Sequence, residues 1–188
     1  MTIGRWYDEL AVGETWSREV AITTAHLDIG AEYVQDFHPL HVDEVFARKS
    51  RFGSRILHGM LTSALMGGPV GAHFYATALA YLEHNARFLA PVKPGDTLTI
   101  EWVVDRLVDK PHHGGGIVEM SGSATNQDGV VAARATGKIL YSRPNFEMRE
   151  RYQISIDPAA FFEESDSALA RASEQTARQV VSSILETF

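Results

Sequence analysis

Residues 56–74 read ILHGMLTSALMGGPVGAHF and form the most apolar stretch of the 188-residue chain. Apolar side chains occupy nearly every side of its first turns, a pattern typical of a helix that is buried all round. Gly67-Gly68-Pro69 is expected to end or kink this helix, because proline lacks the N–H donor and clashes one turn back. A helix of this kind must have other elements packed on it, and the segments downstream can form them.

Strand-like segments occupy 14–22, 78–88, 97–108, 116–126 and 130–141. Residues 91–96 and 126–129 supply turns, with Asp128-Gly129 as a strong hairpin signal, and 110–116 is expected to be a flexible loop. A buried helix followed by a meander of strands predicts an α+β fold, with a curved antiparallel sheet wrapped around the helix.

Shorter elements are expected between the first strand and the apolar helix. Thr23 or Thr24 can cap a helix that runs to about Val34, because a hydroxyl there accepts an unpaired helix amide. A turn at 36–39 and a short helix at 41–47 follow, and 48–55 is a charged connector.

The character of the chain changes after Pro144. Asp157-Pro158 is typical of a helix start, and an amphipathic stripe follows, made of Leu169, Ala172, Thr176, Val180, Ile184 and Phe188. We therefore expect a domain at 1–144 and a helical C-terminal extension at 145–188 that packs on the domain or on a partner subunit.

Composition excludes several classes of protein. With 45% hydrophobic residues the chain can bury a core, and its net charge of −7 argues against broad nucleic-acid binding. The absence of cysteine removes disulfides, thiolate catalysis and cysteine-ligated metals. The N-terminus shows no signal peptide, and no apolar run approaches the roughly 20 residues that span a bilayer. We expect a cytoplasmic protein that binds neither membrane nor nucleic acid.

Asp36 and His41 flank a proline turn and form the first candidate for catalysis. Imidazole titrates near neutral pH, and a carboxylate beside it can share proton transfer or orient a water. Two interpretations fit this spacing. One is a general acid/base pair, and the other is an aspartate that caps the next helix beside a histidine that bonds its own loop.

His58-Gly59-Met60 opens the apolar helix. The first amides of a helix have no internal acceptor, and glycine permits close approach, so Gly59 can seat a developing oxyanion. Alternatively, the glycine only allows the helix start to pack closely on the sheet.

Arg48, Lys49, Arg51 and Arg55 are the densest basic cluster in this acidic chain. Such a cluster forms either a solvated face or a site that attracts the phosphates of a nucleotide-tailed substrate such as an acyl-CoA. A zinc site is disfavoured, because the eight histidines are scattered without the usual ligand spacing.

Three motifs carry a family resemblance. They are Asp36-x-His38-Pro39-Leu40-His41, then Arg55-Ile56-Leu57-His58-Gly59-Met60, then RFLAPVKPGDTL from Arg87 to Leu98. In this order they resemble the MaoC-like (R)-specific enoyl-CoA hydratases and dehydratases, over about Gly13 to Tyr141.

The resemblance implies a hot-dog fold and reversible hydration of a trans-2-enoyl-CoA, with no cofactor and no metal. It implies that Asp36 and His41 activate one water and that the Gly59 amide polarises the thioester carbonyl. Substrate contacts are expected from His38, His58, Met60, Arg48, Lys49 and Arg51. The partners implied are the acyl-CoA substrate and a second copy of the chain, in a homodimer or a higher homo-oligomer.

His38 departs from the family motif, which usually has asparagine there. Unlike asparagine, histidine can carry a charge. A charged His38 would lower the pKa of His41, whereas the other interpretation is a histidine that only hydrogen-bonds its loop.

Two further functions share this scaffold. A hot-dog thioesterase commonly has a carboxylate on the central helix, and residues 59–68 contain neither Asp nor Glu. A non-catalytic subunit that binds acyl groups is the other alternative, against which the Asp36/His41 pair argues.

Overall fold

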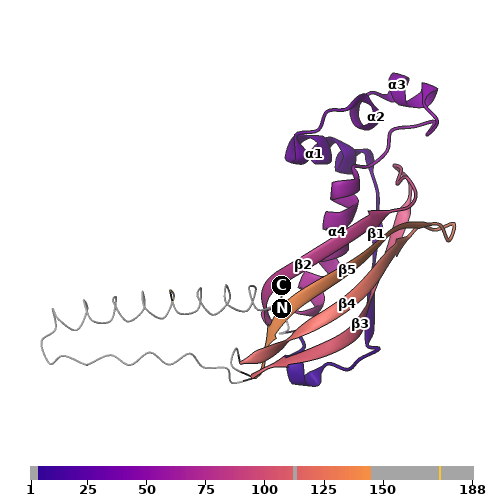
Figure 1. Cartoon of the computed structure of the whole chain (residues 1–188). Helices are drawn as coiled ribbons and strands as arrows, with labels where there is room; N and C mark the ends of the chain where they lie inside the picture. The colour runs from indigo at the N-terminus through magenta and orange to yellow at the C-terminus, as the bar shows by residue number, and fades with distance from the viewer. Residues whose placement is uncertain (1–3, 112–113, 145–173, 175–188) are drawn as a thin grey trace, which may run out of the picture.

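The computed structural model describes residues 4–111, 114–144 and 174 (Figure 1). Its elements are η1 Tyr7–Glu9, β1 Thr15–Ala21, α1 Thr24–Val34, α2 Pro39–Val42, α3 Glu44–Lys49, α4 Gly59–His73, β2 Ala78–Phe88, β3 Thr97–Lys110, β4 Gly115–Thr125 and β5 Val131–Ser142. The helical extension expected at 145–188 lies outside the described residues, apart from Glu174. None of the described helices is long and apolar enough to cross a membrane.

The five strands form one antiparallel sheet in the order β1-β3-β4-β5-β2. Figure 1 shows the sheet curving beside α4, with β1 and β2 at its two edges. The expected α+β arrangement, a curved antiparallel sheet around one long helix, is therefore present.

The connection between β3 and β4 is shorter than expected. The sequence predicted a flexible loop at 110–116, but β3 reaches Lys110 and β4 begins at Gly115. Glycine makes this possible, because a Cβ at Gly115 would lie 1.6 Å from the Tyr141 carbonyl oxygen and one at Gly116 would lie 2.1 Å from the Tyr7 ring. Without side chains, both residues fit into the ladder and strand pairing continues to the turn.

The core lies between the sheet and α4. Alternate residues of β3 face it, and Leu98, Ile100, Trp102 and Val104 are at most 1% exposed. The indole Nε1 of Trp102 donates to the Met66 carbonyl at 2.9 Å, which ties the central strand to the middle of the helix.

Helix α4 differs from its prediction in two ways. An end or a kink was expected at Gly67-Gly68-Pro69, and the helix does not end there but runs through Pro69 to His73. Pro69 is itself buried, so its ring packs in the core, which offsets the lost hydrogen bond. The helix is also buried on one side only: Thr62, Met66, Pro69 and Val70 are buried, whereas Met60 is 64% exposed. The single sheet covers only the side that faces it.

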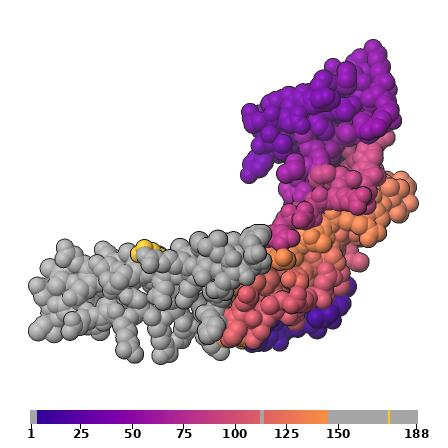
Figure 2. All heavy atoms as spheres, viewed as in Figure 1, coloured from indigo at the N-terminus to yellow at the C-terminus, as the bar shows by residue number. Residues whose placement is uncertain are grey.

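Helices α1, α2 and α3 form a lobe above the start of α4 (Figure 2). Thr23 is the N-cap of α1, as expected. The single short helix predicted at 41–47 is two helices, because Asp43 interrupts it. The Asp43 carboxylate accepts hydrogen bonds from the amides of Val45 (2.8 Å) and Phe46 (3.0 Å), which caps α3 and ends α2.

Candidate active site

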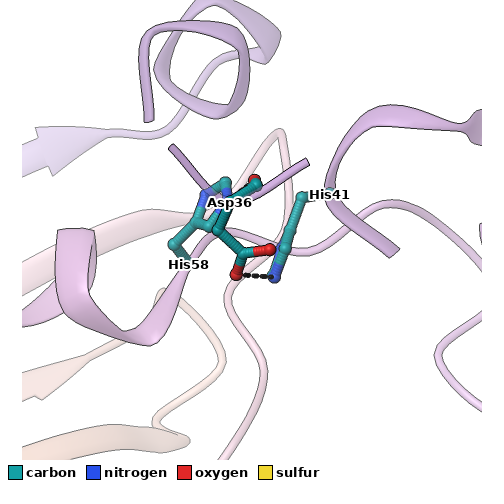
Figure 3. A group of neighbouring side chains, drawn as sticks. All are labelled: Asp36, His41 and His58. Carbon is teal, nitrogen blue, oxygen red and sulfur yellow. Dashed lines mark hydrogen bonds and ion pairs between the residues drawn. The ribbon is translucent and has the colours of Figure 1, made fainter. Parts of the chain in front are cut away.

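The candidate site lies where the lobe meets the start of α4. Gln35 ends α1 in the left-handed conformation (φ 56°), which redirects the chain toward Asp36. Pro39 then occupies the first turn of α2, which carries His41. Figure 3 shows Asp36, His41 and His58 as one group of neighbouring side chains.

The Asp36 and His41 side chains face each other. Asp36 Oδ2 lies 3.8 Å from His41 Nε2 (Figure 3), which is longer than a direct hydrogen bond. The other carboxylate oxygen, Oδ1, accepts the amide of His38 at 3.0 Å. One oxygen therefore fixes the turn, and the other remains available at the surface, where the Asp36 side chain is 49% exposed.

The second nitrogen of His41 is held by the main chain. His41 Nδ1 lies 2.8 Å from the Ile56 carbonyl oxygen, which can only accept, so Nδ1 carries the proton. In the neutral ring the lone pair is then on Nε2, the nitrogen beside Asp36. Burial lowers the pKa of His41, and so do His58 and His38, while the Ile56 carbonyl and Asp36 act in the opposite direction. The neutral ring, which can act as a base, is favoured.

His58 lies beneath this pair. Its side chain is almost completely buried, and its ring stacks on that of His41 with centroids 3.7 Å apart and planes inclined by 25°. His58 Nε2 lies 2.8 Å from the Asp36 carbonyl oxygen. The structure thus places His58 under the two candidate catalytic residues rather than at an open surface.

Gly59 is the first residue of α4, and it borders a pocket of about 280 Å³. A Cβ at this position would lie 3.0 Å from the ring of Phe88, so close packing on β2 by itself requires a small residue. The walls of the pocket are mainly apolar and are formed by Arg51, Phe52, Ile56, Leu57, Gly59, Thr62, Phe88, Leu89, Ala90, Pro91, Val92 and Ala132. The open helix start thus faces a largely apolar hollow. Neither Asp36 nor His41 lines it, but Ile56, whose carbonyl holds His41, does.

A larger hollow, of about 470 Å³, lies elsewhere on the sheet. It is lined by residues of β2, β3, β4 and β5, including Arg87 and Arg134, and contains neither Asp36, His41 nor Gly59. It contains neither Gly59 nor Ile56, whose carbonyl holds His41, so it does not adjoin the candidate active site.

His38 occupies the position where the family motif usually has asparagine, and its side chain caps a helix there. Its Nδ1 accepts the Leu40 amide at 3.3 Å and so caps α2, as an asparagine oxygen would. Its ring centroid lies 6.2 Å from that of His41. The His38 ring therefore lies edge-on beside His41, while its main-chain amide bonds Asp36 Oδ1.

The basic cluster divides into two groups. Arg48 pairs with Glu44 (2.9 Å), and Arg55 pairs with Asp28 (2.9 Å) and, more loosely, with Glu44. Arg51 instead lies over the Phe52 ring, 4.8 Å from its centroid, and lines the pocket. Lys49 and Met60 are exposed at the surface. Arg51 is the member of the cluster best placed to meet a ligand in the pocket.

The three grouped side chains could also be considered as metal ligands. One ligand atom each from Asp36, His41 and His58 comes within 4.8 Å of the others. However, His58 Nε2 is engaged with the Asp36 carbonyl, and lone pairs in the planes of stacked rings do not converge on one ion. This geometry disfavours ligation of one metal ion by all three side chains.

Comparisons with known proteins identify the family. The family model described as a MaoC like domain matches residues 10–123. The chain belongs to the MaoC-like dehydratase family. An (R)-specific enoyl-CoA hydratase of Aeromonas caviae is 35% identical over 54% of this chain and 77% of its own length. A 3-hydroxybutyryl-CoA dehydratase of Methylorubrum extorquens is 30% identical over 55% of this chain and 66% of its own length.

A solved structure agrees with this family. The unliganded R-hydratase PhaJ1 of Pseudomonas aeruginosa aligns with a TM-score of 0.67 at 30% identity, covering 81% of this chain and 96% of that one. The resemblance stated from the motifs and the α+β hot-dog fold are confirmed. The expected class of enzyme, a hydro-lyase of the hydratase/dehydratase type, is confirmed as well. The roles of the individual site residues remain predictions.

Two members of the site were not singled out from the sequence. The Ile56 carbonyl holds His41, but a main-chain acceptor leaves no signature in the residue type. Phe88, which packs on Gly59, was part of the third motif, and its aromatic ring at the end of an edge strand was the available signal.

Proposed function

We propose that this MaoC-like protein catalyses the reversible addition of water to a trans-2-enoyl-CoA, with Asp36 and His41 as its acid–base pair. The observation that carries the proposal is the state of His41. Its Nδ1 is committed to the Ile56 carbonyl, so the free lone pair of the neutral ring is on Nε2, 3.8 Å from Asp36 Oδ2. A water held between these two atoms would meet both a base and a second proton carrier.

In the proposed reaction one water adds across the C2–C3 double bond. His41 Nε2 accepts a proton from the water as its oxygen bonds to C3. The electron pair of the double bond moves toward the thioester, giving an enolate. The Asp36/His41 pair then returns a proton to C2, on the same face, so that the elements of one water are added. Dehydration uses the same groups in reverse.

Gly59 is proposed to stabilise the enolate oxygen through its amide. As the first residue of α4, its N–H has no acceptor within the helix, and the helix dipole favours negative charge at this end. The adjoining pocket offers apolar walls for the acyl part of the substrate, where this interaction would be strengthened by the low dielectric.

Substrate binding is proposed to involve Arg51 at the pocket, with Arg48 and Lys49 contributing positive charge nearby and Met60 beside Gly59. Coenzyme A would enter only as part of the substrate, and the reaction as written needs no cofactor and no metal. A thioesterase is less well supported, because α4 carries no Asp or Glu along its whole length.

A direct assay separates these functions. Purified protein is incubated with crotonyl-CoA and with longer or branched enoyl-CoAs, while enone absorbance and free thiol are followed together. Loss of absorbance without release of thiol is expected. Release of thiol would establish the thioesterase instead, and no change in either signal with any substrate would favour the non-catalytic subunit.

The proposal includes a homodimer. β2 lies at the sheet edge and pairs only with β5 among the described strands, and it exposes the apolar residues Leu79 and Tyr81, each at 43%. An edge strand with unpaired main-chain groups can continue the sheet into a second copy.

A further inference from the structure

We propose that His58 is a positioning residue: through one hydrogen bond and one ring contact, it holds both members of the acid–base pair in place. This inference rests on the proposed function, and it assigns His58 a role other than contact with substrate. One contact is made by the edge of the His58 ring and the other by its face. Nε2 meets the main chain of Asp36, and the ring face meets the ring of His41.

The hydrogen bond determines the tautomer of His58. The Asp36 carbonyl oxygen can only accept, so His58 Nε2, at 2.8 Å, must carry the proton. The other nitrogen, Nδ1, is buried and has no hydrogen-bond partner in the part of the chain that the structure describes. It faces α1, where a Cβ on Gly30 would lie only 3.0 Å away. His58 is therefore a fixed donor toward Asp36.

The surroundings of the ring are closed. Nδ1 is buried with no hydrogen-bond partner among the described residues, on a residue that is only 2% exposed. The nearest titratable groups are His41 and Asp36, with His38 beyond them. Arg55 donates to the His41 carbonyl at 3.5 Å and is itself paired with Asp28. On the side of the ring that faces α1 and α4, the neighbouring residues are Gly30 and Leu61, which carry no charge.

The position of His58 in the chain explains how it can act on a distant turn. It is the N-cap residue of α4, and its own carbonyl accepts the Thr62 amide at 3.0 Å. The main chain of His58 is thus anchored to the core helix, while its side chain reaches a turn that is 22 residues away. The hydrogen bond from His58 therefore fixes the surface turn at 36–39 to the rigid helix α4. Without such a link, a surface turn would hold its side chains less firmly.

The test uses two substitutions that separate the hydrogen bond from the ring. His58→Gln keeps an N–H near the position of Nε2 but removes the ring, whereas His58→Phe keeps the ring but removes the donor. With crotonyl-CoA, we expect His58→Gln to keep kcat within about threefold of the wild type. We expect His58→Phe to lower kcat about 10- to 100-fold with little change in KM, the scale of a misplaced catalytic group. Thermal melting shows whether each variant is folded.

His84→Gln is the matched control. His84 is a partly buried histidine on β2 that contacts Tyr81, and like His58 it has one ring nitrogen, here Nε2, without a partner among the described residues. It should leave kcat unchanged. Wild-type kcat in folded His58→Phe would overturn the proposal, and so would equal losses in both variants that follow their melting temperatures. Failure of the wild type to hydrate any enoyl-CoA would instead defeat the proposed function.

A second measurement does not depend on turnover. Imidazole ¹⁵N spectra of the wild type should show the His58 proton on Nε2, the nitrogen that faces the Asp36 carbonyl oxygen. A proton on His58 Nδ1 instead would contradict the inference.

Discussion

At the residue scale, the two carboxylate oxygens of Asp36 have different tasks. Oδ1 accepts the His38 amide and holds the turn, while Oδ2 faces His41 Nε2. The structural alternative stated for this spacing differs from the structure, because His38 rather than Asp36 caps α2 and His41 bonds the distant Ile56 carbonyl. The spacing of Asp36 and His41 was enough to predict that they lie together. The tautomer of His41 was not predictable, because it depends on a carbonyl 15 residues away.

The first prediction concerns the pair itself. Asp36→Asn and His41→Ala should each reduce turnover of crotonyl-CoA by at least ~100-fold, because each removes a group that carries a proton in the transition state. Both side chains are at least partly exposed, so the variants should remain folded. Stopped-flow or steady-state hydration, with circular dichroism as the folding control, provides the measurement. Near-normal turnover by either folded variant would remove that residue from the mechanism.

The second prediction concerns His38 and pH. Activity needs neutral His41 as the base, so it should fall as pH drops through the pKa of His41. His38 is one of the groups that lower this pKa. His38→Asn keeps an acceptor for the Leu40 amide but removes that influence, so the pKa of His41 should rise. The acid limb of kcat/KM should then move to higher pH, while substantial turnover remains.

The measurement is a pair of pH–rate profiles with the same substrate. Superimposable profiles would mean that His38 serves only as the cap of α2.

At the element scale, α4 shows which features a sequence can and cannot reveal. Its apolar composition predicted a central helix, and the strands that cover it were predicted to within a few residues of their observed bounds. An end or a kink was predicted at Gly67-Gly68-Pro69, because local propensity treats proline as a breaker, and the helix does not end there. Tertiary packing stabilises the continued helix, because Pro69 is buried and, in the preceding turn, the Met66 carbonyl accepts a hydrogen bond from the Trp102 indole.

The third prediction tests that contact between helix and sheet. Trp102→Phe should lower the free energy of unfolding by at least about 1 kcal/mol more than Trp16→Phe does, the scale of one hydrogen bond. Trp16 is the matched control, because its Nε1 is buried with no acceptor among the described residues, so its removal costs no such bond. Urea unfolding monitored by circular dichroism gives both values. Equal losses would show that the Trp102–Met66 bond adds nothing to stability.

At the scale of the whole molecule, the site assembles residues from a lobe, a helix start and a sheet edge. Asp36 and His41 come from the lobe, Gly59 from α4 and Phe88 from the end of β2. The motifs predicted that these residues form one site, and the structure brings Asp36, His41 and His58 together. The motifs could not predict that Phe88 packs on Gly59 or that His58 lies under His41, because these contacts depend on how the lobe is set on the sheet.

The last prediction concerns assembly. If β2 continues the sheet into a second copy, light scattering should give twice the chain mass of 20.8 kDa. Leu79→Lys should shift the protein toward the monomer, because a lysine on an edge strand opposes pairing with another strand. Val12→Lys is the control, since Val12 is 64% exposed and lies outside β2, and it should leave the mass unchanged. A wild type that stays monomeric at micromolar concentration would refute the homodimer. A dimer that survives Leu79→Lys would place the interface away from this part of β2.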